Sequence, residues 1–287
     1  MPPRSVPPPE KLVFLFGHPV AHSLSPAMHD AAFRELGMPY RYAALDVLPG
    51  SVEGAVELLR LPGTIGANVT VPHKEAVIPF LDRVDADARW LRSVNTITRK
   101  GRRLVGSSTD GPGFLRSLGG EARRLKGATA VLVGAGGGAR AVAGALLAAG
   151  TSRILVTDVD AARARGLVRL LRSRRRGFDA SAVDRREAEK VLDRAGIVVQ
   201  ATPVGLHGRD PSPLSLSRAC RGSLAVDLVY HRRTRFLEDA ARRGMRTLSG
   251  LGMLLHQGAL SFGSWTGRKA PVHVMERALR KVLRRTR

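Results

Sequence analysis

Two residues in the first half of the chain, Lys74 and Asp110, have side chains that could move a proton. Lys74 ends the segment NVTVPHK, in which Pro72 is expected to begin a helix. A lysine in the first turn lies against the positive end of the helix dipole, which disfavours its protonated form and suits a proton shuttle. Asp110 precedes a Gly-Pro-Gly sequence that predicts a turn leading towards a helix. The alternatives are a solvated surface lysine and an aspartate that only caps a turn or helix.

Two serine hydroxyls precede these residues. Ser23 and Ser25 are two positions apart, so in an extended segment both hydroxyls point the same way and together could bind a carboxylate. Plain N-capping of a helix by Ser25, with Pro26 in the first turn, is the alternative.

Three amides and a further hydroxyl lie where a ligand could meet them. Asn68 and Thr70 have the period-2 spacing that places both side chains on one face of a predicted strand. Asn95 lies on another predicted strand. Gln257 lies in a predicted helix, where an amide that only faces solvent is the alternative.

A glycine-rich loop (GAGGGA) follows an apolar run and precedes an alanine-rich stretch, which matches G-x-G-x-x-A between a strand and a helix. Its first glycine permits a tight turn, its second lets the backbone approach a pyrophosphate, and its alanine keeps the helix close to the sheet. The N-terminus of that helix attracts phosphate groups. A flexible turn is the alternative. The expected cofactor-binding residues of the loop are Gly134, Ala135, Gly136, Gly137, Gly138 and Ala139.

An acidic residue, Asp158, follows the next predicted strand, 24 positions after Gly134. A carboxylate about 20 residues after the loop can accept hydrogen bonds from the 2′-hydroxyl of NAD. The 2′-phosphate of NADP would face a like charge there, and Asp160 would add to it. Arg163 and Arg165 follow and could bind that phosphate. The residues therefore favour NAD, with some use of NADP.

Composition indicates a soluble enzyme. The chain has 287 residues, 44% hydrophobic and 25% charged, and no apolar run of the roughly 18 residues that a membrane helix needs. The N-terminus, MPPRSVPPPE, lacks the apolar region of a signal peptide and is expected to be a disordered tail. The formal charge of +23 raises the alternative of a nucleic-acid-binding protein, but the basic residues are scattered. Nonspecific adhesion to polyanions is expected at low salt.

Histidine and cysteine offer little chemistry. His18 and His22 lack a nearby acidic ligand, so no metal site is expected. Cys220 is the only cysteine, which excludes an intramolecular disulfide and fits a reducing cytosol. We expect a cytoplasmic protein.

Apolar runs predict where these residues are held. The first part of the chain alternates short strands and helices and contains a hairpin around 100–101. The second alternates buried strands with helices, which favours a parallel, doubly wound sheet. The expected organisation is an α/β domain at 11–111, a Rossmann-like domain at 112–250 and C-terminal helices at 251–287 that complete the first domain. The expected strands are 11–16, 40–47, 66–71, 128–133, 153–157, 197–201 and 224–228.

Seven motifs occur in an order that resembles the shikimate dehydrogenase family. They are SLSPAMH (23–29), NVTVPHK (68–74), SVNTI (93–97), STDGPG (108–113), GAGGGARA (134–141), ATPVG (201–205) and GLGMLLHQGA (250–259). The resemblance spans residues 11 to about 279. It implies a substrate domain, a dinucleotide-binding domain, a cleft between them, and reversible oxidation of shikimate by NADP or NAD in aromatic amino acid biosynthesis.

The resemblance also assigns roles by position. Lys74 and Asp110 match the family's catalytic pair, and Ser23 and Ser25 match its carboxylate-binding serines. Other implied substrate-binding residues are Asn68, Thr70, Asn95, Tyr230 and Gln257; further implied cofactor-binding residues are Thr202 and Gly250.

The chain departs from the family pattern in two places. Val159, in Asp-Val-Asp, stands where NADP-using relatives carry arginine, which supports the lean towards NAD. Gln200 stands before Ala201 where relatives often carry asparagine. A quinate/shikimate dehydrogenase of broader specificity is the alternative function, and a homodimer is considered as the assembly.

Overall fold

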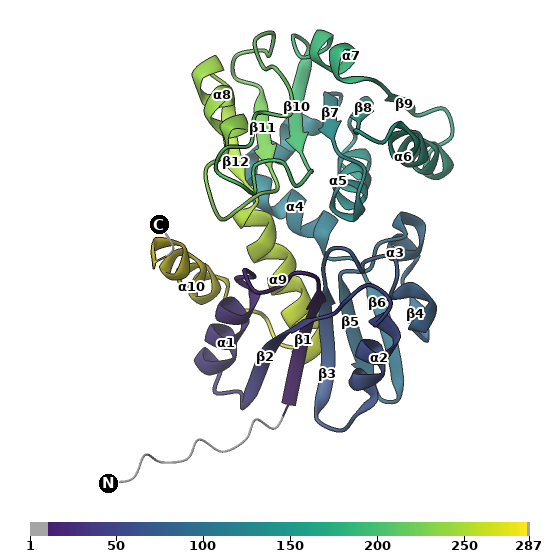
Figure 1. Cartoon of the computed structure of the whole chain (residues 1–287), viewed down its shortest axis with the longest axis vertical. Helices are drawn as coiled ribbons and strands as arrows, with labels where there is room; N and C mark the ends of the chain where they lie inside the picture. The colour runs from purple at the N-terminus through teal and green to yellow at the C-terminus, as the bar shows by residue number, and fades with distance from the viewer. Residues whose placement is uncertain (1–10, 286–287) are drawn as a thin grey trace. The chain divides into compact units, whose positions relative to one another are not determined.

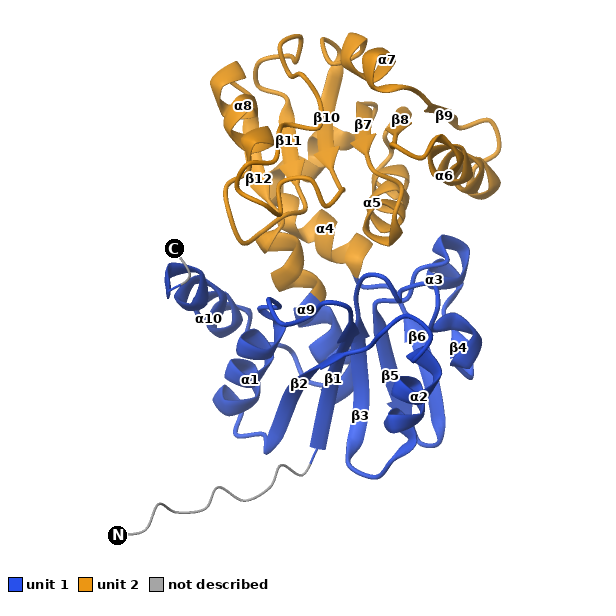
Figure 2. Cartoon of the chain, viewed as in Figure 1, with its two compact units in different colours: residues 1–109, 258–287 blue, residues 110–257 orange. Residues whose placement is uncertain are grey.

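The computed structural model describes residues 11–285. The tail expected at 1–10 lies outside the described residues. The chain divides into two compact units: unit 1 comprises residues 1–109 and 258–287, and unit 2 comprises residues 110–257 (Figure 2). The expected divisions followed residues 111 and 250, whereas the observed ones fall after Thr109 and after Gln257. The second division lies inside a single helix, α9 (Leu251–Thr266), which supplies residues to both units.

Unit 1 is built on a six-stranded mixed sheet of order β2-β1-β3-β5-β6-β4 (Figure 1). β1 pairs in parallel with β2 and β3, whereas β5 is antiparallel to β3 and forms the predicted hairpin with β6. The elements are β1 (Lys11–Gly17), α1 (Ser25–Glu35), β2 (Tyr40–Asp46), α2 (Val52–Glu57), η1 (Leu58–Arg60), β3 (Thr64–Val69), η2 (Ile78–Phe80), β4 (Arg83–Val84), α3 (Ala86–Leu91), β5 (Thr96–Lys100), β6 (Arg103–Ser107) and α10 (Val272–Arg285).

One apolar cluster on this sheet explains why its strands read as hydrophobic runs. Phe16 of β1, Val69 of β3 and Ile97 of β5 are almost completely buried in it. Each of these three strands lies between two neighbouring strands of the sheet, which hold it from both sides.

Unit 2 is built on a six-stranded parallel sheet of order β12-β11-β10-β7-β8-β9. Its strand order reverses between β7 and β10, as in a doubly wound dinucleotide-binding fold, and such sheets bind ligands at that point. The elements are α4 (Asp110–Leu118), η3 (Gly119–Leu125), β7 (Thr129–Val133), α5 (Gly137–Ala148), β8 (Arg153–Thr157), α6 (Ala161–Arg174), β9 (Asp179–Ala182), α7 (Arg185–Lys190), β10 (Ala195–Gln200), β11 (Leu224–Asp227), α8 (Arg235–Arg243) and β12 (Arg246–Ser249).

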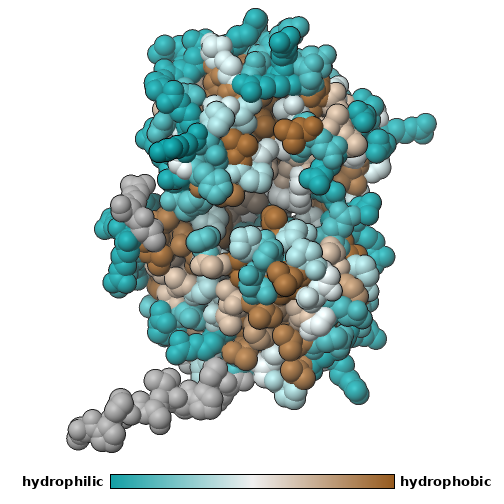
Figure 3. All heavy atoms as spheres, viewed as in Figure 1, coloured by the Kyte–Doolittle hydropathy of each residue, from teal (hydrophilic) through white to brown (hydrophobic). Residues whose placement is uncertain are grey.

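The predicted parallel sheet and Rossmann-like order are therefore confirmed. Ala130, Val131 and Leu132 of β7 are fully buried, as expected for a strand covered on both faces. Among residues 11–285, no helix has the length and apolar character to cross a membrane. Figure 3 shows hydrophilic residues over much of the visible face, with apolar residues between them.

Three local predictions were wrong. Residues 71–77 form successive turns rather than a helix begun by Pro72. The Lys74 carbonyl accepts a hydrogen bond from the backbone N–H of Val94 (2.8 Å), which lies just before β5. In a helix, this carbonyl would instead accept a hydrogen bond from a residue of the same helix. The Gly-Pro-Gly sequence lies inside the first turn of α4, where a proline is tolerated, rather than in a turn before it. Ser25 is the first helical residue of α1 and not its N-cap.

Candidate active site

The two serines lie at the start of α1. The Ser23 hydroxyl oxygen accepts a hydrogen bond from the Ser25 backbone N–H at 3.2 Å. The N-cap position, Leu24, makes no side-chain cap, so the hydroxyl that serves this helix end is that of Ser23 and not that of Ser25. The hydroxyl of Ser25 forms no hydrogen bond with another described residue, so it can bind a ligand at this helix end.

Asn68 is the centre of a buried hydrogen-bond network in unit 1. Its carbonyl oxygen accepts from the Tyr42 hydroxyl (2.8 Å), and its amide nitrogen donates to the Asn95 carbonyl and to the Ser261 hydroxyl (both 3.0 Å). Asn68 is 4% exposed. Tyr42 and Ser261 were missed by sequence reasoning, because Ser261 is 193 positions away and no local pattern marks either residue.

The Asn95 side chain binds Thr109, the residue directly before Asp110. Its side-chain oxygen accepts from the Thr109 backbone N–H (2.7 Å), and its amide nitrogen donates to the Thr109 hydroxyl (2.9 Å). The Thr109 hydroxyl also lies 3.2 Å from that of Ser261. This clamp fixes the residue directly before Asp110. Asn95 itself lies just before β5 and not on the strand where it was expected.

Thr70 directly follows β3 and is half-buried. Its backbone N–H donates to the Phe16 carbonyl at 2.8 Å, which ties it to the end of β1. A Cβ on Gly17 would lie 2.3 Å from the Thr70 methyl carbon, so the glycine makes room for this side chain. Thr70 and Lys74 thus occupy one segment beyond the strand end, and the helix-dipole argument for Lys74 does not apply.

In unit 2, Asp110 begins α4 and is 4% exposed. Two glycines let α4 pack closely: a Cβ on Gly111 would lie 3.0 Å from the Ala141 carbonyl oxygen of α5, and one on Gly113 only 2.6 Å from the Gln257 backbone nitrogen of α9. Asp110 and Gln257 are therefore held in the same part of unit 2. Gln257 is 8% exposed, so a solvent-facing amide is excluded, and its amide nitrogen donates to the Leu254 carbonyl (2.8 Å).

The glycine loop has the geometry that a dinucleotide requires. Gly134 has φ +108°, which a side chain would strain, and a Cβ there would lie 2.8 Å from the Ala201 carbonyl oxygen. A Cβ on Gly136, the N-cap of α5, would meet nothing within 4 Å, so a pyrophosphate could approach the backbone there. Ala139 is fully buried beneath the helix. These residues fit the cofactor that the sequence predicts.

The acidic residues after β8 are engaged with the backbone. One Asp158 oxygen accepts from the Ala135 N–H (2.7 Å) and the other from the Asp160 N–H (2.9 Å). Asp160 caps α6 by accepting from the N–H of Ala162 and pairs with Arg163 at 3.4 Å. Asp158 therefore holds the glycine loop directly, a contact that spacing alone did not predict.

Several exposed side chains follow β8, among them Val159 and Arg163. Val159 is fully exposed, and Arg163 is 68% exposed beside Asp160. An adenine ribose bound here would therefore meet Asp158, an apolar Val159 and an arginine already paired with a carboxylate.

The remaining predicted residues lie in the loops after β10 and β11 and just after β12. Thr202 is half-buried, and its backbone N–H donates to the Gln200 side chain (2.6 Å). Gly250 lies against the Leu228 carbonyl, where a Cβ would come within 2.1 Å of the oxygen, so packing alone requires the glycine. Burial raises the pKa of Tyr230, which favours its neutral phenol as a hydrogen-bond donor.

A buried carboxyl group organises the loop that carries Tyr230. Asp227 accepts from the Thr234 hydroxyl (2.5 Å) and from the Val229 N–H (2.9 Å). Desolvation raises the pKa of Asp227 to about 6, against the effect of these two bonds. Sequence reasoning missed Asp227, although it lies in a predicted strand.

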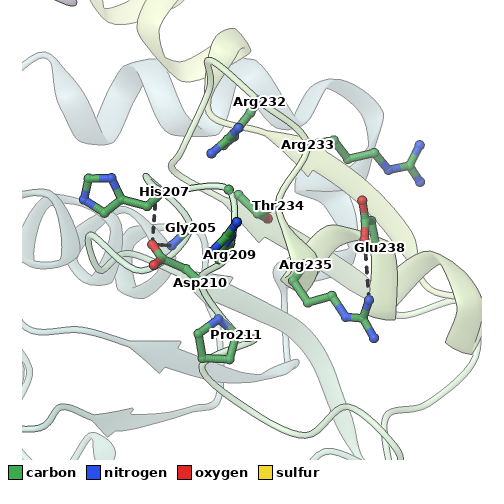
Figure 4. Close-up of a pocket in the computed structure, with 11 residues that line it drawn as sticks. Gly205, His207, Arg209, Asp210, Pro211, Arg232, Arg233, Thr234, Arg235 and Glu238 are labelled. Atoms are coloured by element: carbon green, nitrogen blue, oxygen red, sulfur yellow. Dashed lines mark hydrogen bonds and ion pairs between the residues drawn. The ribbon is translucent and has the colours of Figure 1, made fainter.

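A cavity of about 320 Å³ lies beside this loop and contains none of the predicted site residues. Figure 4 shows Arg232 and Thr234 facing the segment around His207, while Arg235 is paired with Glu238. The Asp210 carboxylate accepts from the N–H groups of Gly205 and His207, which lowers its pKa. The cavity is thus a basic surface depression outside the candidate site.

His18 has an ordinary polar role. Its ring lies 2.9 Å from Asp46 at the exposed ends of β1 and β2. Among the described residues, no group of three or more His, Cys, Asp or Glu side chains could hold a metal ion.

The predicted residues divide between the two units. Unit 1 holds Ser23, Ser25, Asn68, Thr70, Lys74 and Asn95; unit 2 holds Asp110, Tyr230, Gln257 and all the predicted cofactor-binding residues.

Comparison with known proteins gives two matching domain families and relatives of nearly full length. Residues 15–97 match the shikimate dehydrogenase substrate binding domain, and residues 250–280 match the shikimate 5′-dehydrogenase C-terminal domain. The chain is 45% identical over 279 residues to shikimate dehydrogenase (NADP⁺) of Methanopyrus kandleri, covering 95% of this chain and 96% of that protein.

Solved structures of shikimate and quinate dehydrogenases are similar to this chain over nearly its whole length. The shikimate 5-dehydrogenase of Thermus thermophilus, in complex with NADP(H) and shikimate, has a TM-score of 0.84 and 39% identity, over 94% of this chain and 99% of that one. The quinate dehydrogenase of Corynebacterium glutamicum, in complex with NAD, has a TM-score of 0.87 and 31% identity, over 94% and 99%. The chain belongs to the shikimate dehydrogenase family.

Proposed function

We propose that the protein is a shikimate dehydrogenase, which oxidises the ring alcohol of shikimate to the ketone of 3-dehydroshikimate with reduction of a nicotinamide dinucleotide. The observation that carries this proposal is the alignment of almost the whole chain with an enzyme of that name. The glycine loop and the doubly wound sheet of unit 2 support the cofactor class. A place in the biosynthesis of aromatic amino acids follows from that reaction.

The substrate carboxylate is assigned to Ser23 and Ser25. The Ser25 hydroxyl has no hydrogen-bond partner among the described residues, and the N-terminus of α1 adds a positive dipole end beside it. Thr70, Asn68 and Asn95 are assigned to the ring hydroxyls. Because Asn68 and Asn95 already bond within unit 1, their amides are rigid, which suits recognition of a small rigid ring.

Lys74 and Asp110 are assigned to the proton. A dinucleotide bound in unit 2 would supply the acceptor for the hydride of the alcohol carbon, and the hydroxyl proton must leave for the C=O bond to form. An amine and a carboxylate beside the hydroxyl can take that proton and pass it to water. Asp110 is nearly buried at a helix start, and Asn95 fixes the residue before it. Tyr230 and Gln257, both in unit 2, are assigned to substrate binding.

The cofactor residues are assigned within unit 2. The loop from Gly134 to Ala139 would hold the pyrophosphate, and Thr202 and Gly250 lie in the loops assigned to the nicotinamide half of the cofactor. Asp158 is assigned to the adenine ribose. Its carboxylate is fixed by two backbone N–H groups, so it stays where a 2′-phosphate would meet its charge.

We infer that NAD is used better than NADP, although the relative from Methanopyrus kandleri is named for NADP⁺. Val159 offers no charge to a 2′-phosphate, and Arg163 is shared with Asp160. Measuring kcat/KM for NAD and for NADP tests this: the ratio should exceed one. It should fall sharply in the double variant Asp158→Asn with Val159→Arg. A native enzyme that strongly prefers NADP would show that Arg163 and Arg165 outweigh the aspartates.

A quinate/shikimate dehydrogenase is the second candidate, favoured by similarity to the quinate dehydrogenase that was solved with NAD. One assay separates the two: the rate of dinucleotide reduction with shikimate and with quinate, each with NAD and NADP. The main proposal expects kcat/KM for shikimate to exceed that for quinate by at least about tenfold, which corresponds to about 1.4 kcal/mol of transition-state stabilisation. Comparable values would favour the broader enzyme. The cytoplasmic location and the homodimer stay predictions.

A further inference from the structure

Gln200 occupies a central position in unit 2. It is the last residue of β10, is completely buried, and pairs in register with Val133, the last residue of β7. The next backbone N–H, that of Ala201, donates to the Val133 carbonyl at 2.8 Å. The loop that follows β10 therefore starts directly beside the glycine loop, at the point where the strand order of the sheet reverses.

The Gln200 side chain is turned into this loop and uses both ends of its amide. The oxygen accepts from the Thr202 backbone N–H (2.6 Å) and from the Thr202 hydroxyl (2.8 Å). The nitrogen donates to the backbone carbonyls of Val204 (2.6 Å) and Thr202 (3.2 Å). One buried amide thus satisfies four polar groups of a segment that belongs to no helix or strand.

Apart from Gln200, residues 201–204 are held by two backbone bonds at their ends: the Ala201 N–H donates to the Val133 carbonyl (2.8 Å), and the Pro203 carbonyl accepts from the Leu206 N–H (3.1 Å). Pro203 is exposed and has no N–H, and Thr202 and Val204 are half-buried. The Thr202 hydroxyl accepts from the Val204 N–H (3.2 Å), so this internal bond depends on a group that Gln200 itself holds. The far end of the loop is fixed independently, by Asp210 on the Gly205 N–H. Removal of the Gln200 amide would therefore loosen residues 202–204 and leave the anchors at Ala201 and Gly205 in place.

We propose that Gln200 is a positioning residue for the dinucleotide: its amide pre-forms the 201–205 loop that lines the cofactor site beside the glycine loop. This inference rests on the proposed function, because it takes Thr202 and its neighbours as part of the cofactor site. A loop that is ordered before binding lowers the entropy that binding must remove, so its loss should weaken cofactor affinity more than it slows the chemical step.

Three variants test the proposal. Gln200→Ala removes both ends of the amide, and Gln200→Asn keeps an amide on a side chain one methylene shorter. Val198→Ala is the matched control, since Val198 lies two residues earlier on the same strand, is equally buried in the apolar core, and has no polar side-chain group that could bond to the loop. The measurements are the Kd of NADH and NADPH by direct fluorescence titration, kcat and KM for shikimate at saturating cofactor, thermal stability, and amide hydrogen exchange.

In Gln200→Ala we expect the dinucleotide Kd to rise about tenfold, as loss of a few buried hydrogen bonds predicts. kcat and the KM for shikimate should change by less than about threefold, because the groups that touch the substrate are unaltered. The N–H groups of Thr202 and Val204 should exchange faster. Gln200→Asn should restore part of the affinity. Val198→Ala should lower thermal stability and leave the Kd unchanged.

Normal dinucleotide affinity in Gln200→Ala, or an equal loss in Val198→Ala, would overturn the proposal. Absence of dinucleotide binding in the unmodified enzyme would instead overturn the proposed function, and this inference with it. Dinucleotide binding without oxidation of shikimate would overturn only the proposed substrate. The comparison of dinucleotide Kd values between the variants would still test the positioning role of Gln200.

Discussion

His29 should make folding sensitive to mild acid. Its ring is completely buried on α1, stacked on Tyr42 at 4.5 Å, and neither ring nitrogen has a hydrogen-bond partner among the described residues. Burial lowers the pKa of His29 from 6.5 to about 3. Between these two values the unfolded chain binds a proton at this residue that the folded protein does not bind. The free energy of unfolding therefore falls as the pH falls from 6.5 towards 3.

The size of the effect follows from the shift. Each pH unit below the unfolded pKa contributes about 1.4 kcal/mol. At pH 5, about 1.5 units below that value, His29 should cost about 2 kcal/mol of stability. The His29→Leu variant cannot bind the proton, so it should escape this loss, whereas the contributions of carboxyl groups stay common to both proteins.

The assay is urea unfolding at about pH 7.5 and about pH 5, for the unmodified protein and for His29→Leu. The unmodified protein should lose about 2 kcal/mol more than the variant between the two conditions. His22→Leu is the control, because His22 is exposed. Between the two pH values, His22→Leu should lose as much free energy of unfolding as the unmodified protein does. Equal losses in His29→Leu and the unmodified protein would refute the reasoning, since they would mean that the ring is protonated in the fold or reached by water.

Other predictions concern the site. Replacing both Ser23 and Ser25 by alanine should raise the KM for shikimate at least about tenfold, since a carboxylate loses charge-assisted bonds; an unchanged KM would reject this role. Asn95→Ala should lower kcat about tenfold or more, because the residue before Asp110 loses both bonds to it; steady-state kinetics with normal kcat would contradict the clamp. Gly113→Ala should destabilise the protein by about 1–3 kcal/mol in thermal unfolding, because its Cβ would meet the Gln257 backbone; an unchanged Tm would contradict that contact.

The sequence predicted those parts of the structure that local chemistry determines. The glycine loop, the buried run of β7 and the hairpin between β5 and β6 are set by glycine, apolar and turn residues close in the chain, and the structure has them as expected. Motif order predicted the family.

Contacts between distant residues could not be predicted in this way. The Ser261 hydroxyl accepts a hydrogen bond from the Asn68 amide, although the two residues are 193 positions apart. The Lys74 carbonyl accepts from the Val94 N–H, in a segment of turns where Pro72 was expected to begin a helix. Asp158 was expected to reach the adenine ribose; the structure shows that its carboxylate accepts a hydrogen bond from the Ala135 N–H, which the spacing did not predict. At Lys74 a tertiary hydrogen bond outweighs a local propensity, which is a weak prior.

The central claim is that Lys74 and Asp110 act as one proton-transfer unit in shikimate oxidation. The most direct test is kcat at saturating shikimate and cofactor for Lys74→Ala, Asp110→Ala and the double variant. Each single variant should lose about 10²-fold or more in kcat with modest change in cofactor affinity, and the double variant should be little worse than the worse single variant. A near-normal kcat in either single variant, or losses that multiply in the double variant, would contradict the account.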